Sequence, residues 1–322
     1  MTEELVRVEK LAVLRGGTRG QRRILEDISF SIRRAEVLAL VGESGCGKTT
    51  LAYALTRLFP ASAEMEIRGT AWMRSRDLFR MSEEELLEIR RHDVRYILQE
   101  PAQAFSPVRS IEEQFRACTS AANAGGHPPS DSLIESQLRR AGIDEPSRVL
   151  HAYPHELSVG TLQRVLIAMA TATSPFLLIA DEPTSAIDAP LRRQVLDLIV
   201  SFRNDSGLSI LLITHDLAVA EGYADRIAVL YAGRIVEIAP RAAFFERPLH
   251  PYSRLLVQYA LASLASIDDL PPLDSFTGRE GFAPEGCLFY PRCRMGRGEC
   301  RISEPPLESP AAERYVRCPY WK

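Results

Sequence analysis

Short apolar runs recur along the chain and predict a buried sheet. Residues 24–32 alternate partly between apolar and polar side chains, as a strand with one buried face does. Residues 37–41 form an unbroken apolar run that ends at Gly42, a pattern typical of a strand buried on both faces. Similar runs over residues 176–180 and 209–214 predict two more buried strands.

Helix-forming stretches lie between these strands. Ser82 is followed three positions later by Glu85, and this pair predicts a capping box at the start of a helix over residues 82–92. Strands that alternate with helices favour the α/β class with a largely parallel sheet. The remaining predicted elements are helices over residues 48–58, 162–173 and 192–203, a flexible loop over 121–130, and a hairpin over 227–238 that turns near Gly233.

Composition narrows the class of protein. The chain has 322 residues, of which 46% are hydrophobic and 25% charged, so disordered and fibrous classes are excluded. A net charge of −3 gives no global basic field of the kind that nucleic-acid binding uses. The sequence lacks both an apolar run of the ~18 residues that would span a bilayer and a leader-like N-terminus. We therefore expect a protein that starts in the cytoplasm and does not cross a membrane alone.

Residues 42–49 fit the phosphate-loop pattern G-x-x-x-x-G-K-[ST], between a predicted strand and a predicted helix. The glycines let backbone N–H groups turn toward an anion, and the helix N-terminus adds partial positive charge. Lys48 can reach the β- and γ-phosphates, and Thr49 can ligate Mg²⁺. A chance match in a turn is the alternative. The predicted nucleotide contacts are Gly42, Ser44, Gly45, Cys46, Gly47, Lys48, Thr49 and Thr50, with Cys46 as a loop occupant and not a nucleophile.

Two carboxylates follow the predicted strand 176–180. Asp181 and Glu182 lie where that strand ends, at the sheet edge where open α/β sheets bind ligands. Asp181 is expected to hold Mg²⁺, and Glu182 to orient or deprotonate an attacking water. An Asp-Glu pair alone often marks only a helix start. Together with the phosphate loop, it predicts nucleotide hydrolysis.

The motifs resemble those of the ATP-binding subunits of ABC transporters. Residues 181–188 (DEPTSAID) match the carboxylate strand and D-loop of that family, and residues 157–161 (LSVGT) stand where its signature motif lies. Gln99 matches the Q-loop glutamine and His215 the switch histidine. All of these motifs follow one another in the family's order.

The resemblance implies a P-loop NTPase fold: a RecA-like core with a mainly parallel sheet, a β-rich N-terminal part and an inserted helical subdomain at about residues 85–160. It also implies that two subunits enclose two ATP molecules head to tail. Ser158 and Gly160 would then contact the ATP of the partner subunit, and His215 the γ-phosphate of the ATP bound in cis. Gln99 would sense Mg²⁺ and water and connect to the membrane subunits.

The sequence departs from the family at two places. Val159 replaces the usual glycine of the signature motif, which removes a positive-φ option and adds bulk beside phosphate, and Thr161 replaces a polar or methionine residue. We expect the site completed for the partner to be weakened. Near the position of the family's adenine-stacking aromatic stand Leu14 and Arg15, and Arg15 is expected to stack through its guanidinium plane.

The C-terminal part resembles the oligopeptide/dipeptide/nickel importer subfamily, through an HPY segment over residues 248–257 and the run GCLFYPRC over 286–293. We expect a cassette over residues 1–247 and an extension over 248–322, with His250 as a turn residue and not a ligand. Four cysteines spaced C-x5-C-x6-C-x17-C lack the close pairs of zinc sites and suit a [4Fe–4S] cluster better, with zinc, free thiols or a disulfide as alternatives. These cysteines are Cys287, Cys293, Cys300 and Cys318.

These features together predict the ATPase subunit of a binding-protein-dependent importer, for di- or oligopeptides, with nickel and glutathione left open. Its expected cofactors are ATP, Mg²⁺ and the cluster. Its expected partners are a second, different ATPase subunit, two permease subunits and an external solute-binding protein, at the cytoplasmic face of the cell membrane, with no nucleic acid. The alternative is a non-transport ABC ATPase of DNA repair or translation, although the chain lacks the heptads and tandem cassettes of that class.

Overall fold

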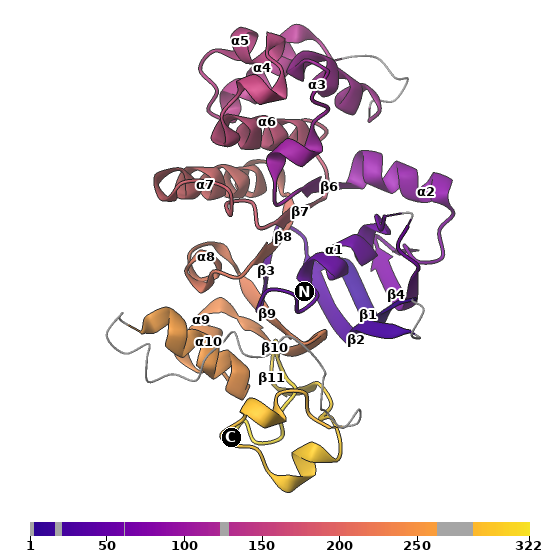
Figure 1. The fold of residues 1–322 in the computed structure, drawn as a ribbon, viewed down its shortest axis with the longest axis vertical. Helices are drawn as coiled ribbons and strands as arrows, with labels where there is room; N and C mark the ends of the chain where they lie inside the picture. The colour runs from indigo at the N-terminus through magenta and orange to yellow at the C-terminus, as the bar shows by residue number, and fades with distance from the viewer. Residues whose placement is uncertain (1–2, 17–20, 61, 123–128, 263–285) are drawn as a thin grey trace. The chain divides into compact units, whose positions relative to one another are not determined.

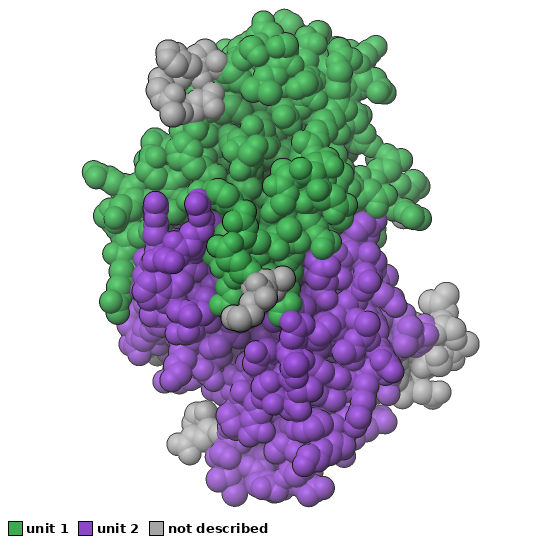
Figure 2. All heavy atoms as spheres, turned by 180° about the vertical axis from the view of Figure 1, so that it is seen from behind, with its two compact units in different colours: residues 1–5, 33–36, 80–211 green, residues 6–32, 37–79, 212–322 purple. Residues whose placement is uncertain are grey.

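A computed structural model describes residues 3–16, 21–60, 62–122, 129–262 and 286–322. The chain divides into two compact units, each made of segments that are far apart in sequence (Figure 2). Unit 1 comprises residues 1–5, 33–36 and 80–211, and unit 2 comprises residues 6–32, 37–79 and 212–322. No helix among the described residues is both long and apolar enough to cross a membrane.

Unit 2 contains a four-stranded sheet in the order β2-β1-β4-β5. The strand predicted over residues 24–32 is confirmed as part of β2, in which Leu25, Ile28, Phe30 and Ile32 are buried. Strand β1 pairs antiparallel with β4. The bounds are β1 Glu4–Arg15, β2 Arg22–Arg33, β4 Met65–Met73 and β5 Arg76–Asp77.

A second group of strands in unit 2 runs in the order β11-β12-β10-β9-β3. Strand β3 pairs parallel with β9, and β9 and β10 form the predicted hairpin, which turns at Gly233 with a φ of 83°. Strand β12 pairs antiparallel with β10, so the C-terminal segment adds strands to the sheet of this unit. The bounds are β3 Val37–Val41, β9 Arg226–Tyr231, β10 Arg234–Pro240, β11 Glu308–Ala311 and β12 Arg314–Val316.

The helices of unit 2 include the one that follows the phosphate loop and those that lead into the C-terminal part (Figure 1). Tyr252, Phe244 and Phe289 are buried together in the core that these helices share with β3, β9 and β10. The predicted helix 48–58 is confirmed, two residues shorter. The bounds are α1 Lys48–Thr56, α8 Leu217–Tyr223, α9 Arg241–Glu246, α10 Pro251–Leu261, η5 Tyr290–Arg292 and η6 Gly298–Arg301.

A buried carboxylate fixes the start of α10. Glu237 is fully buried on β10 and accepts the N–H groups of Leu249, at 2.9 and 3.0 Å, and of His250, at 2.8 Å. Arg314 of β12 pairs with the same carboxylate at 3.4 Å. One acidic side chain thus joins the hairpin, the helix start and the C-terminal strand.

Replacing Glu237 with alanine is expected to lower the free energy of unfolding of the purified subunit by about 3 kcal/mol, because two N–H groups and a guanidinium lose a buried partner. Glu237→Gln keeps an acceptor oxygen and should cost less. Urea denaturation measures both, with the exposed Glu246→Ala as the control that changes little. Equal stability of Glu237→Ala and Glu246→Ala would contradict this assignment.

Unit 1 begins its strand–helix alternation with α2 and β6. The predicted capping box is confirmed: the Ser82 side chain accepts the Glu85 N–H and the Glu85 carboxylate accepts the Ser82 N–H. The predicted helix 82–92 is α-helical only over α2 Glu83–Glu88 and continues as a π-helical turn over η1 Ile89–Asp93. Strand β6 Val94–Ile97 pairs parallel with β7 Leu177–Asp181, which confirms the predicted strand 176–180 to within one residue.

The other helices of unit 1 include one with a second capping box, Ser110 with Glu113, which sequence reading missed (Figure 1). The predicted helix 192–203 is confirmed within the longer α7, and the predicted helix 162–173 is confirmed as α6, which starts three residues earlier and ends two residues earlier. Strand β8 Ser209–Thr214 confirms the predicted strand 209–214. It crosses the sequence boundary between the units. Most of the loop predicted over 121–130 lies outside the described residues. The bounds are α3 Ile111–Ser120, α4 Asp131–Arg140, α5 Pro146–His151, α6 Val159–Thr171 and α7 Ala189–Ser206.

Candidate functional site

The phosphate-loop motif joins β3 to α1 within unit 2. Gly45 and Gly47 have φ values of 78° and 111°, in the left-handed region that favours glycine, and Gly47 is the N-cap of α1. A side chain at Gly42 would place its Cβ 2.2 Å from the carbonyl oxygen of Leu230 on β9. The motif glycines are therefore required by the backbone, and the loop opens onto a helix N-terminus suited to an anion.

Lys48 lies folded over this loop. Its side chain is buried, and Nζ donates to the carbonyl oxygens of Gly42, at 2.8 Å, and Glu43, at 3.0 Å. Ser44, Gly45 and Thr49 are exposed, and Thr50 is half-buried. The ammonium group thus lies at the loop, with a hydroxyl and open backbone beside it.

Cys46 is a buried part of the loop. Burial raises the pKa of its thiol to about 11, so the sulfur is protonated near neutral pH. Its carbonyl oxygen accepts the N–H of Gly233, 2.9 Å away in the β9–β10 turn. Cys46 therefore stabilises the loop through its burial and this hydrogen bond. Its thiol is not the thiolate that a nucleophile needs.

The carboxylate pair lies at the end of β7 in unit 1. Asp181 is buried, and its Oδ2 accepts a hydrogen bond of 3.3 Å from the hydroxyl of Tyr96 on β6. Glu182 follows with a φ of 46°, a left-handed conformation that costs a residue with a side chain about 1–3 kcal/mol. The strand therefore ends in a left-handed backbone turn at Glu182.

Gln99 lies near the same strand end. It follows β6, is exposed, and its carbonyl oxygen accepts a 3.5 Å hydrogen bond from the Ser185 hydroxyl, which also bonds to the Glu182 carbonyl at 3.1 Å. The parallel pairing of β6 with β7 thus brings Gln99, Asp181 and Glu182 to one edge of unit 1.

The signature motif forms the N-terminus of α6. Ser158 is the N-cap, and its Oγ accepts the Thr161 N–H at 3.2 Å. Val159 is the first residue of the helix, with 44% of its side chain exposed and no positive φ. The expectation that valine removes a needed positive-φ option is therefore wrong, because this position is right-handed helix; only added bulk remains. A Cβ at Gly160 would lie 3.3 Å from a methyl of Leu191.

Two further predicted contacts lie in unit 2. His215 follows β8 and is exposed, one residue before Asp216, which caps α8 by accepting the Ala218 N–H at 2.8 Å. Arg15 is the exposed last residue of β1.

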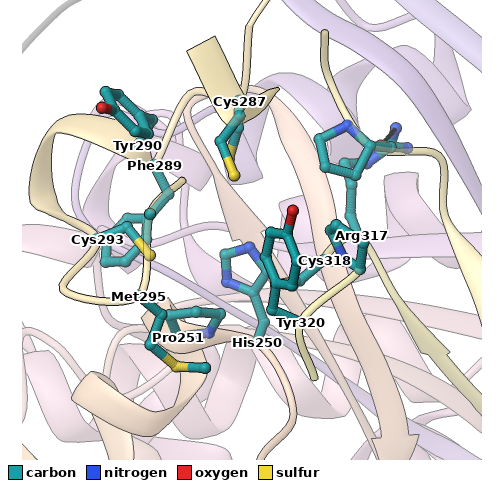
Figure 3. A pocket seen from close by; sticks show the side chains of 14 residues that line it. His250, Pro251, Cys287, Phe289, Tyr290, Cys293, Met295, Arg317, Cys318 and Tyr320 are labelled. Atoms are coloured by element: carbon teal, nitrogen blue, oxygen red, sulfur yellow. Dashed lines mark hydrogen bonds between the residues drawn. The ribbon is translucent and has the colours of Figure 1, made fainter. Parts of the chain in front are cut away.

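The four C-terminal cysteines line one cavity in unit 2, together with His250 (Figure 3). All four are unbridged. Burial raises the pKa of Cys287 to about 12 and also raises those of Cys293 and Cys318, so these thiols are neutral without a metal. Within the described part of the chain, no group of three or more His, Cys, Asp or Glu is arranged to hold a metal ion.

His250 is a structural residue at the edge of this cavity. It is the N-cap of α10, and its Nδ1 accepts the Tyr252 N–H at 3.1 Å, so the neutral ring carries its proton on Nε2. Complete burial lowers the pKa of His250 to about 3. The ring packs against Phe289, with centroids 5.7 Å apart.

Comparison with protein families matches residues 25–185 to the ABC transporter family and residues 236–300 to the C-terminal region of oligopeptide/dipeptide transporters. A dipeptide transport ATP-binding protein of Escherichia coli is 34% identical over 321 residues, covering 98% of this chain and 96% of its own length. The chain belongs to the ABC transporter family.

Other members agree with this assignment. A probable peptide ABC transporter ATP-binding protein of Sinorhizobium fredii is 36% identical and covers 90% of the chain and 87% of its own length. Among solved structures, a dimeric ATP-binding cassette bound to ADP and Pi has a TM-score of 0.65 at 22% identity, covering 73% of this chain and 98% of its own. An ABC transporter component from Clostridium perfringens has a TM-score of 0.63 at 24% identity, covering 80% and 96%. These likenesses establish the P-loop NTPase fold of the ABC ATPases.

Proposed function

We infer that this ABC ATPase is the ATP-hydrolysing subunit of an importer for di- or oligopeptides. The observation that carries this inference is the joint match: an ABC cassette and, behind it, the C-terminal region of oligopeptide/dipeptide transporters in one chain. Relatives that align along almost the whole chain are described as peptide or dipeptide transport proteins. We also propose the cassette over residues 1–247 and the extension over 248–322.

The residues of the phosphate loop and those at the end of β7 have different roles toward ATP. Backbone N–H groups of residues 42–50 bind the phosphates, and the Lys48 ammonium, now on two loop carbonyls, neutralises the β- and γ-oxygens. Thr49, Gln99 and Asp181 are the residues that would hold Mg²⁺, which supplies charge neutralisation at the phosphates. Glu182 accepts a proton from the attacking water.

The remaining motif residues act around the γ-phosphate. His215 contacts it in cis, Gln99 senses Mg²⁺ and water and connects to the permeases, and Arg15 stacks on adenine. Ser158 and Gly160 face the ATP of the partner subunit, because a serine N-cap at a helix start offers a hydroxyl and free N–H groups to phosphate. The exposed Val159 side chain lies among these groups, and its bulk weakens the site that this chain completes.

The assembly we propose contains a second, different ATPase subunit, two permeases and an external solute-binding protein, with the ATPases at the cytoplasmic face of the cell membrane. Affinity purification of the chain from its own membranes, followed by mass spectrometry, tests this assembly. Recovery of two polytopic permeases and a second cassette protein supports the importer. Recovery of ribosomal or DNA-repair proteins instead would favour a non-transport ABC ATPase.

We further propose that the cysteine-lined cavity holds a [4Fe–4S] cluster. Four thiols, three from loops and that of Cys300 from the short helix η6, line one apolar cavity, and thiolates are the ligands that iron–sulfur clusters require. Among the described residues no group of three or more His, Cys, Asp or Glu is placed to hold a metal ion, so the proposal rests on the four thiols of this cavity and on their chemistry. Cys287, Cys293, Cys300 and Cys318 would hold the cluster, which cross-links loops that have little other regular structure.

Purification without oxygen is expected to yield protein with iron and acid-labile sulfide in equal amounts and absorption near about 400 nm. Cys300→Ser should lose most of both, since Cys300 is a buried member of the set. Cys118→Ser, in α3 of unit 1, is the matched control and should keep both. Zinc in place of iron, or no metal at all, would refute the cluster.

A further inference from the structure

Glu43, the second residue of the phosphate loop, is bonded to two residues of the C-terminal extension. Its backbone N–H donates to the hydroxyl of Tyr252 on α10, at 3.1 Å. Nη1 of Arg292, in the turn η5, bonds to both oxygens of its carboxylate, at 3.0 and 3.3 Å. Glu43 and Arg292 are 249 positions apart in the chain. All three residues belong to unit 2.

The contact is largely shielded from water. The Arg292 and Glu43 side chains are only 11% and 20% exposed, and Tyr252 is fully buried. The Arg292 guanidinium lies 5.8 Å from the ring centroids of both Tyr231 and Phe289. An ion pair with little water around it is stronger and better ordered than one on an open surface.

Glu43 is therefore held through each of its polar groups. The Tyr252 hydroxyl accepts its N–H, and the Arg292 guanidinium donates to its carboxylate. The Lys48 ammonium donates to its carbonyl oxygen at 3.0 Å. The last of these bonds involves the lysine that binds phosphate. A shift of Glu43 would move both the loop backbone and a partner of Lys48.

We propose that Arg292 and Tyr252 are positioning residues of the ATP site, which hold Glu43 so that the phosphate loop is preorganised for nucleotide. The proposal rests on the assignment of residues 42–49 as the phosphate loop. Preorganisation improves affinity because the cost of ordering the loop is met before ATP arrives.

The position of Arg292 makes this link dependent on the extension. Arg292 lies in the turn between Cys287 and Cys293. A hydrogen bond of 3.0 Å from the Cys293 N–H to the Tyr290 carbonyl oxygen stabilises this turn. Cys287 in turn donates its N–H to the Cys300 carbonyl at 2.8 Å. The order of the cysteine-lined cavity thus sets the order of Arg292, and the extension contributes to nucleotide binding.

The test compares Arg292→Gln, Glu43→Gln and their double variant, together with Tyr252→Phe, in the purified transporter complex. We expect each single variant to raise KM for ATP about 10-fold with kcat changed less than about 2-fold. Because Arg292 acts through Glu43, the double variant should be no worse than either single one. The exposed Arg294→Gln is the matched control and should behave as wild type.

A purely structural role gives a different result. KM for ATP would then stay at the wild-type value while the melting temperature falls, or the effects of Arg292→Gln and Glu43→Gln on KM would multiply in the double variant. Either result overturns the proposal. Failure of the loop assignment itself is separable, because Lys48→Ala would then bind ATP as the wild type does.

Discussion

Lys48→Ala is expected to reduce ATP turnover of the transporter by about 10²–10³-fold and to weaken ATP binding strongly. In the structure the Lys48 ammonium is buried and bonded to the carbonyl oxygens of Gly42 and Glu43. Its removal deletes the positive charge that would meet the phosphates and takes one donor from each of those two carbonyl oxygens. Nucleotide titration and steady-state phosphate release measure the two effects.

Lys322→Ala is the control for this prediction. It removes the same charge from an exposed residue at the C-terminus and should leave binding and turnover unchanged. An ATP affinity of Lys48→Ala within about 2-fold of the control would show that residues 42–49 do not bind phosphate. In a phosphate loop of this pattern the lysine is expected to reach the β- and γ-phosphates.

Glu182→Gln is expected to slow ATP hydrolysis by about 10³-fold while ATP binding is kept. The amide has nearly the same shape as the carboxylate and leaves the left-handed turn after β7 in place, but it does not accept a proton from water. Bound ATP should therefore persist in the complex. Single-turnover experiments measure the hydrolysis rate, and a separate assay measures how much ATP stays bound to the complex.

Glu135→Gln, on α4 of the same unit, is the matched control, because its carboxylate is partly exposed and pairs with a helix neighbour, Arg139, at 3.4 Å. Its turnover should equal that of the wild type. Unchanged turnover in Glu182→Gln would assign the proton transfer to another group.

Sequence patterns located the buried strands and one of the helix starts that a capping box fixes. The unbroken apolar run of β3 and the Ser82–Glu85 box are local signals, so they could be recognised without the fold. The C-terminal strand β12 has three residues and no readable alternation, and its pairing with β10 depends on long-range packing. The π-helical turn after α2 likewise departs from a pattern that reads as continuous helix.

The candidate site divides in the same way. The loop glycines, Lys48 and Asp181 belong to contiguous motifs whose spacing carries the chemistry. The contact between Glu43 and Arg292 follows no spacing rule and is visible only in the folded chain. At Val159 the family resemblance predicted a position that favours glycine. The structure instead has ordinary right-handed helical backbone there.

We propose that ATP hydrolysis by this chain drives peptide uptake. The most direct measurement is dipeptide uptake and phosphate release by the purified complex in proteoliposomes, with the external binding protein added and ATP on the side of this subunit. We expect ATP-dependent dipeptide accumulation and faster hydrolysis when loaded binding protein is present, both lost in Glu182→Gln. Hydrolysis without any dipeptide uptake, at a rate unaffected by the loaded binding protein, would contradict it.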